Sequence, residues 1–200
     1  MGGGSMSNFE FVFSLFGLLL GLALATVLGG LSNALQERHK IKVGWLTPLL
    51  GLLVALDIAS FWTIAWSVRN ALQPNYFYLL SGLLVTGTYF FVARMVFPTN
   101  FAEWPDFDVY YFGHKRWVLF GVIFCDLAAY AAQVVLGAHP FSSLLDKIIV
   151  FLFFPGLAAA ALARGKRLNI ALLVYLVLLY PVAAILYQLH VGTGDAVRLM

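Results

Sequence analysis

The sequence predicts an all-α membrane protein, a polytopic bundle of about six transmembrane helices. Apolar residues make up 62% of the 200 residues and charged residues only 10%, whereas a soluble domain carries roughly 25% charged residues. The apolar residues form long uninterrupted runs, unlike the short alternating runs of a soluble core. We therefore expect the chain to be embedded in a lipid bilayer, which is its main partner.

Six apolar runs are long enough to cross a bilayer, because a spanning helix needs roughly 20 mostly apolar residues. We expect the helices at about 9–35, 45–68, 76–97, 110–137, 142–163 and 169–189. Residues 1–5, Met-Gly-Gly-Gly-Ser, look like an artificial leader before a native Met6. No linker marks a soluble domain, so we expect one transmembrane domain over residues 6–200.

The distribution of basic residues indicates how the chain is oriented in the membrane. They gather in the odd-numbered loops, as Arg38, Lys40, Lys42, Lys115, Arg116, Arg164, Lys166 and Arg167. The other side holds only Arg69, Lys147 and Arg198. Cytoplasmic loops are enriched in lysine and arginine, so we expect loops one, three and five in the cytoplasm and both termini on the non-cytoplasmic side. The bases are a topology signal, and we expect no nucleic-acid partner.

Asp57 and Asp126 are the residues most informative about function, since an aspartate at the centre of a spanning helix costs roughly 2.5 to 3.5 kcal/mol. Asp57 lies twelve residues before Arg69, and Asp126 lies thirteen residues before His139. Both are therefore roughly 18 to 20 Å below the outer boundary. If their helices are neighbours, the two carboxylates face a common space that holds a proton or a small cation. The alternative is that each aspartate is protonated or bonded to another helix and is purely structural.

Other residues in the spanning segments suit an ion path. The candidate lining hydroxyls are Ser60, Thr63, Thr86 and Thr88. Pro155 and Pro181 fall inside the fifth and sixth helices, where proline kinks or breaks a helix and frees carbonyl groups. We expect these two kinks to permit movement.

The first helix carries a ridge of small residues, which recur every four positions as Gly17, Gly21, Ala25 and Gly29. Such a ridge lets another helix approach closely. We favour a partner helix within the chain, although a second copy of the protein is a plausible partner and would make a homo-oligomer through this helix. A membrane scaffold or assembly protein is the function that this feature supports.

The third loop is the least lipid-like stretch, because residues 98–116 mix acidic, aromatic and basic side chains. We expect an amphipathic start of the fourth helix from Asp106 onward, lying at the cytoplasmic surface. An enzyme would have to use the polar residues of this loop, with or without a metal ion, and these are Glu103, Asp106, Asp108 and His114.

Several catalytic and cofactor motifs are missing from the sequence. His39, His114, His139 and His190 all lie at segment ends, which argues against a haem held by paired histidines inside the bundle. The chain has no phosphate-binding glycine loop, no His-Glu-x-x-His, no Gly-x-Ser-x-Gly and no cysteine cluster. We expect no cofactor, no resident metal and, on balance, no enzymatic activity.

The function that these observations favour is a channel or transporter for protons, small cations or small solutes, working through Asp57 and Asp126. A scaffold and an enzyme of the cytoplasmic face remain the alternatives. The stretches that begin at Phe16 and at Phe124 resemble polytopic bacterial proteins, a resemblance that implies nothing about chemistry. The expected location is the inner (plasma) membrane of a bacterium.

Overall fold

The computed structural model describes residues 8–39, 42–71, 75–100, 103–104 and 106–198, with side chains between residues 10 and 189. The leader expected at residues 1–5 lies outside the described residues. The described chain forms six helices: α1 (Asn8–Gln36), α2 (Leu46–Ser67), α3 (Tyr76–Val96), α4 (Phe107–Val135), α5 (Leu144–Leu162) and α6 (Lys166–Arg198). The prediction of an all-α fold with six helices is confirmed.

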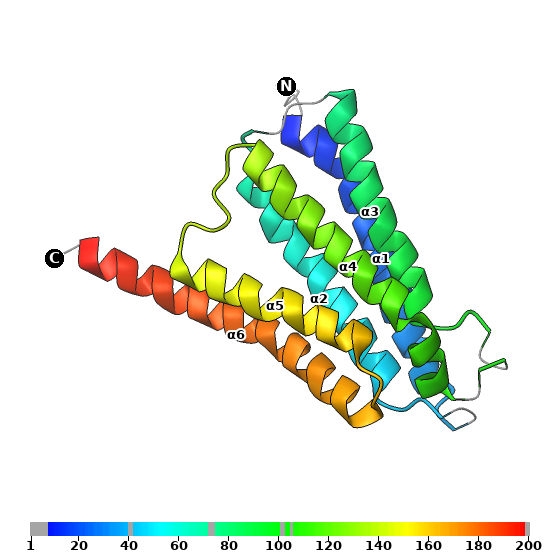
Figure 1. The fold of residues 1–200 in the computed structure, drawn as a ribbon. Coiled ribbons are helices and arrows are strands. Elements are labelled where there is room, and N and C mark those ends of the chain that lie inside the picture. The colour runs from blue at the N-terminus through cyan, green and yellow to red at the C-terminus, as the bar shows by residue number, and fades with distance from the viewer. Residues whose placement is uncertain (1–7, 40–41, 72–74, 101–102, 105, 199–200) are drawn as a thin grey trace.

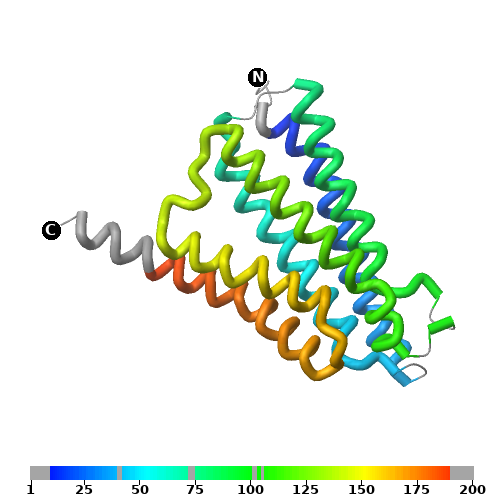
Figure 2. Tube along the Cα trace, in the orientation of Figure 1, coloured from blue at the N-terminus to red at the C-terminus, as the bar shows by residue number. Residues whose placement is uncertain are grey.

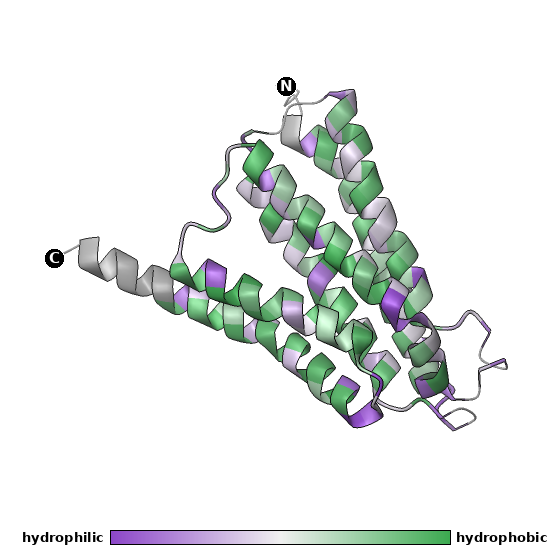
Figure 3. Cartoon of the chain, viewed as in Figure 1, coloured by the Kyte–Doolittle hydropathy of each residue, from purple (hydrophilic) through white to green (hydrophobic). Residues whose placement is uncertain are grey.

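All six helices are long and apolar enough to cross a membrane. The helices are apolar along most of their length, and many of the hydrophilic residues lie at the helix ends and in the loops (Figure 3). Many large apolar side chains of all six helices are exposed. The chain therefore has the organisation of a multi-pass membrane protein, whose lipid-facing surface is apolar because the bilayer core offers no hydrogen bonds.

The helices form two groups that diverge from each other (Figures 1 and 2). In the first group α1 packs against α3 and α2, and α4 packs against α3 and α2. The second group is the α5–α6 hairpin, which contacts the first group through α4 and α2. The loops at 37–45, 97–106 and 163–165 lie at one end of the molecule, which we call the basic end (Figure 1). The loops at 68–75 and 136–143 lie at the opposite end, where the hairpin diverges from α4 (Figure 1).

Two glycines allow α1 to pack closely, and neither belongs to the predicted ridge. A Cβ atom on Gly82 would lie 2.1 Å from Cζ of Phe16, and one on Gly30 would lie 2.5 Å from Cδ2 of Phe97. By contrast, a Cβ atom on Gly21 or Gly29 would meet nothing within 4 Å. The α1 helix buries the stripe of larger residues beside the ridge, because these bury more apolar area. That stripe is Val12, Phe16, Leu20, Ala23 and Val27.

The ridge of small residues is thus not the intrachain packing face that the sequence favoured. Gly21, Ala25 and Gly29 are exposed, and Gly17 approaches only Phe13 of its own helix. The expectation of a partner helix inside the chain is wrong for these residues.

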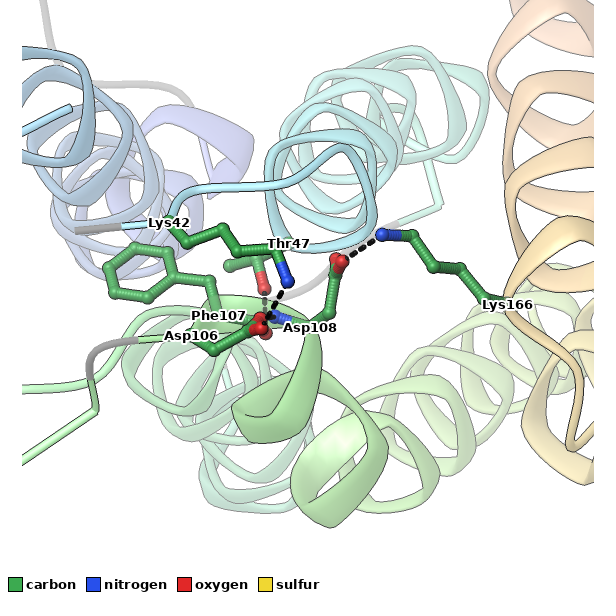
Figure 4. Close-up of polar contacts among 6 residues, drawn as sticks. All are labelled: Lys42, Thr47, Asp106, Phe107, Asp108 and Lys166. Atoms are coloured by element: carbon green, nitrogen blue, oxygen red, sulfur yellow. Dashed lines mark hydrogen bonds and ion pairs between the residues drawn. The ribbon is translucent and has the colours of Figure 1, made fainter. Parts of the chain in front are cut away.

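At the basic end, α4 begins at Phe107 with Asp106 as its cap, in agreement with the helical start predicted from Asp106 onward and three residues before the spanning segment predicted at about 110. The Asp106 carboxylate accepts a hydrogen bond from the Asp108 backbone N–H at 2.9 Å, and also binds Lys42 Nζ at 2.7 Å. The backbone N–H of Phe107 donates to the Lys42 carbonyl oxygen at 3.0 Å, and Thr47 Oγ1 donates to the Phe107 carbonyl oxygen at 3.0 Å. These contacts tie the chain before α2 to the start of α4 (Figure 4).

The next residue of that turn joins α4 to α6. Asp108 forms an ion pair with Lys166 at the start of α6 (Figure 4). Gly44 has a φ of +63° and lies so close to Asp108 that a Cβ atom would be 2.3 Å from Oδ1. Only glycine combines this backbone conformation with this close approach.

A buried lysine fastens the α5–α6 hairpin to α4. Lys115 is 3% exposed, and its ammonium group donates to the carbonyl oxygen of Ala160 at 2.8 Å, to that of Ala163, and to Asn169 Oδ1 at 2.7 Å. Tyr111 OH donates to the same Asn169 oxygen at 2.9 Å. The last carbonyls of a helix carry partial negative charge and lack helical partners. Lys115 satisfies them at the end of α5.

The hairpin helices are continuous through their prolines. Pro155 lies within α5 and Pro181 within α6, and neither ends its helix. The α5 helix starts with a capping box in which Ser143 Oγ accepts from the Asp146 N–H at 3.0 Å and Asp146 Oδ2 accepts from the Ser143 N–H at 2.9 Å. The α6 helix runs on to Arg198, beyond the predicted end at about residue 189.

Candidate functional site

A cavity of about 440 Å³ lies between the two helix groups. Its walls come from α2, α4, α5 and α6, and His139, Pro140 and Ser142 of the α4–α5 loop line it at the opposite end. The α5–α6 hairpin diverges from α4 toward this end of the molecule (Figure 1). Both Asp57, on α2, and Asp126, on α4, line it. The two aspartates that the sequence singled out are therefore brought to one cavity.

Asp57 is held by two tyrosines from other helices. It is 1% exposed, its Oδ2 accepts a hydrogen bond from Tyr89 OH of α3 at 3.0 Å, and its Oδ1 accepts one from Tyr180 OH of α6 at 2.7 Å. A buried carboxylate is costly unless its oxygens are hydrogen-bonded. The two phenols meet that need, and they also link α2, α3 and α6 through one side chain.

Asp126 lies beside Asp57 but is less completely bonded. It is 5% exposed, it lines the same cavity as Asp57, and its Oδ2 atom has no hydrogen-bond partner among the described residues. Two ionised carboxylates close together in a low dielectric repel each other, so such a pair favours the binding of a proton or a cation. The unpartnered oxygen is itself buried, and it belongs to a residue of the cavity wall.

The predicted lining hydroxyls divide into two pairs. Ser60 and Thr63 line the cavity, and each hydroxyl donates to a carbonyl of its own helix, at 2.8 and 2.7 Å, so that its oxygen lone pairs remain available. Thr86 and Thr88 of α3 are not among the cavity residues. Their hydroxyls donate to the carbonyl oxygens of Gly82 and Leu84, both at 2.8 Å.

The cavity also contains polar residues that the sequence analysis did not place in the ion site. Gln133 is 7% exposed, and its Nε2 atom has no hydrogen-bond partner among the described residues. Asp146 accepts a hydrogen bond from Tyr187 OH at 2.6 Å, in addition to its role in the α5 cap. Tyr130 and Phe153 add aromatic surface between these groups. Tyrosines and amides inside a spanning segment need partners, which was the available signal for this cluster.

The predicted cytoplasmic-face residues do not form one site. Asp106 pairs with Lys42, and Asp108 pairs with Lys166. Glu103 Oε1 accepts from Asn100 Nδ2 at 2.8 Å. The His114 ring stacks on Tyr110 at 4.0 Å between centroids, with Nδ1 3.0 Å from the Tyr110 carbonyl oxygen. Each of these polar groups is therefore engaged by its own partner.

The ion pair at the basic end shifts the titration of both partners. The hydrogen bond from Lys42 holds the pKa of the Asp106 carboxyl below its ordinary value of 3.8. The same contact raises the pKa of Lys42 above 10.5. Each group stabilises the charged form of the other.

Within the residues that the structure describes, no group of three or more histidine, cysteine, aspartate or glutamate side chains is arranged to hold a metal ion. Comparisons with known proteins add no constraint on the cavity. No protein-family model, no curated protein and no solved structure matches this chain.

Proposed function

We propose that this protein is a membrane transporter or channel that moves protons or small cations through the cavity shared by Asp57 and Asp126. The observation that carries the proposal is the meeting of two buried carboxyl groups from separate helices at one cavity wall. One structural aspartate is fully served by hydroxyl partners. A second aspartate at the same cavity, with an oxygen left unbonded, adds a cost that packing alone does not repay.

The contacts of Asp57 suggest how binding is coupled to movement. Tyr180 belongs to α6 of the diverging hairpin, and its hydroxyl donates directly to Asp57. A proton or cation bound at Asp57 competes with this phenol for the same oxygen. Occupation of the site therefore weakens one link between the hairpin and α2, whereas the Lys115 contacts at the basic end stay in place.

We place the basic end in the cytoplasm, with both termini on the other side of a bacterial inner membrane. The odd-numbered loops that carry most of the basic residues all lie at this end. In this orientation the cavity reaches toward the non-cytoplasmic side, where the α4–α5 loop lines it.

Ion flux into liposomes that contain the purified protein tests the proposal. We expect Asp57→Asn and Asp126→Asn each to lower proton or alkali-cation flux at least tenfold, because each removes a charge from the shared site. Glu103→Gln makes the same change at an exposed carboxylate of the basic end and should leave the flux unaltered. The proposal fails if the folded wild type conducts none of these ions, or if both cavity variants match it.

A second candidate function is assembly with another membrane helix, and the exposed ridge of α1 favours it. A bulky residue at Gly21 or Gly29 has open space in the single chain, so Gly21→Ile and Gly29→Ile should fold normally. If a second copy packs on the ridge, these variants should reduce the oligomeric mass in mild detergent. Gly82→Ile is the contrasting variant, since it collides with Phe16 and should impair folding itself. Equal mass for the wild type and both ridge variants would exclude this interface.

A further inference from the structure

The cavity is much larger than an ion site requires. Its volume is about 440 Å³, within the range of roughly 300 to 1,000 Å³ found for small-molecule sites. A water molecule occupies about 30 Å³, so the space accommodates a molecule of several heavy atoms together with some water. A proton or a bare alkali cation leaves most of this space unexplained.

The wall combines acidic groups with aromatic rings. Tyr130, Phe153 and Tyr180 line the cavity beside the two aspartates, and the Phe153 and Tyr180 rings meet edge to face at 5.7 Å. Among the described lining residues there is no lysine or arginine. Carboxylates and the faces of aromatic rings together attract organic ammonium groups, whereas Mg²⁺ and Ca²⁺ select clustered oxygen ligands.

Two buried polar atoms of α4 remain without a partner in the described chain, and they differ in kind. Asp126 Oδ2 is an acceptor and Gln133 Nε2 is a donor. Both residues line the cavity and both are more than nine-tenths buried, at 5% and 7% exposure. An unsatisfied buried polar atom costs about 1 to 3 kcal/mol, so a ligand that bonds both atoms relieves two such costs.

The spacing of these residues sets the length of such a ligand. Residues seven apart on a helix lie on nearly the same face, about 10.5 Å apart along the axis. With hydrogen bonds of about 2.9 Å at each end, roughly 5 Å remains between the two polar ends of the ligand. A metal ion or an ammonium ion is too short to meet both residues.

We infer that the cavity binds a small organic amine that carries a hydrogen-bond acceptor a few carbon atoms from its nitrogen. The ammonium group lies against Asp126 and Asp57, the acceptor receives the Gln133 amide N–H, and the aromatic rings cover the carbon chain. As a statement about the transported substrate, this inference rests on the proposed transport function. As a statement about binding, it is tested separately.

The probe is 4-aminobutan-1-ol, compared with butylamine, which lacks the acceptor, and butan-1-ol, which lacks the charge. Binding to the full-length protein in detergent is measured by calorimetry or by the shift in melting temperature, in NaCl and in KCl. We expect 4-aminobutan-1-ol to bind roughly 2- to 12-fold more tightly than butylamine, the value of one neutral hydrogen bond. Butan-1-ol should not bind measurably.

The matched variants assign the contacts. Gln133→Met keeps the size of the side chain and should abolish the advantage of 4-aminobutan-1-ol while leaving butylamine affinity unchanged. Asp126→Asn should weaken both amines at least tenfold. The control is Thr88→Ala, since Thr88 is not among the cavity residues and its hydroxyl donates to the carbonyl oxygen of Leu84 in its own helix.

The inference is overturned if butan-1-ol binds as well as the amino alcohol, or if Gln133→Met weakens both amines equally. Because Gln133→Met is a conservative change, it keeps the test available should Asp126→Asn fail to fold. If no amine binds while Asp57 and Asp126 still support ion flux, this inference fails and the proposed function stands. If the amines bind as described but neither they nor any ion crosses the membrane, the site stands and the transport function fails.

Discussion

Replacing Lys115 by methionine tests whether a buried ammonium group holds the α5–α6 hairpin to α4. The change keeps the length and apolar stem of the side chain but removes its three hydrogen bonds. Asn169 Oδ1 retains the Tyr111 hydroxyl, and the Ala163 carbonyl retains the Asn169 amide at 3.0 Å. The Ala160 carbonyl loses its side-chain donor entirely.

The expected cost follows from these partners. One buried carbonyl left without its donor costs about 1 to 3 kcal/mol, and two weakened acceptors add about 1 kcal/mol together. Relief of the buried charge offsets part of this, since taking an ammonium group out of water is itself unfavourable. We expect a net loss of about 2 kcal/mol, which lowers the melting temperature by roughly 4 to 8 °C for a chain of this size.

The assay is thermal unfolding of the purified protein in detergent, followed by circular dichroism. Arg116→Met is the matched control, because Arg116 is the adjacent base and is exposed, and its removal should change the melting temperature little. If Lys115→Met melts as the wild type does, or if both variants lose equal stability, the lysine does not anchor the hairpin.

Two further predictions concern the basic end. Gly44→Ala should destabilise the fold by more than the roughly 1 to 2 kcal/mol that a left-handed alanine costs, because its methyl group would lie 2.3 Å from Asp108 Oδ1. The control is Gly137→Ala, at φ +79° in open space, which should cost only the conformational part. Equal losses of stability in denaturant unfolding would argue against the close contact at Gly44. The stabilisation from the Lys42–Asp106 pair should be present at neutral pH, disappear as the pH falls below 3.8 through the lowered pKa of Asp106, and disappear again as it rises above 10.5 through the raised pKa of Lys42. The difference in melting temperature between the wild type and Asp106→Asn measures it, and a difference that persists at pH 2 to 3 would contradict the assignment.

The helix count and the depth of the aspartates were accessible from sequence because both depend on distance along the chain. A run of apolar residues has a length that the bilayer thickness sets, and equal offsets from the helix ends place Asp57 and Asp126 at one depth. That the two helices are neighbours is not encoded in any such distance. It results from the order in which helices pack, which the structure supplies.

The contacts that depend on helix rotation were not accessible in this way. The small residues of α1 predicted a packing face, but the stripe centred on Phe16 and Leu20 is buried instead. Lys115 was counted among the bases of the third loop, although it lies inside the segment predicted at about 110–137. In the structure it lies within α4 and faces the end of α5, a contact that depends on how α4 is rotated.

Lys115 attaches the α5–α6 hairpin to α4 at the basic end, so a rotation of the hairpin about these contacts would be largest at its opposite end. The α5 helix has 19 residues, which corresponds to a length of about 28 Å. A rotation of about 10° about the Lys115 contacts displaces the far end of α5 by about 5 Å over that length, comparable to the diameter of a small solute. Under the proposed transport function, the width of the cavity mouth would depend on the geometry of a few hydrogen bonds at the basic end.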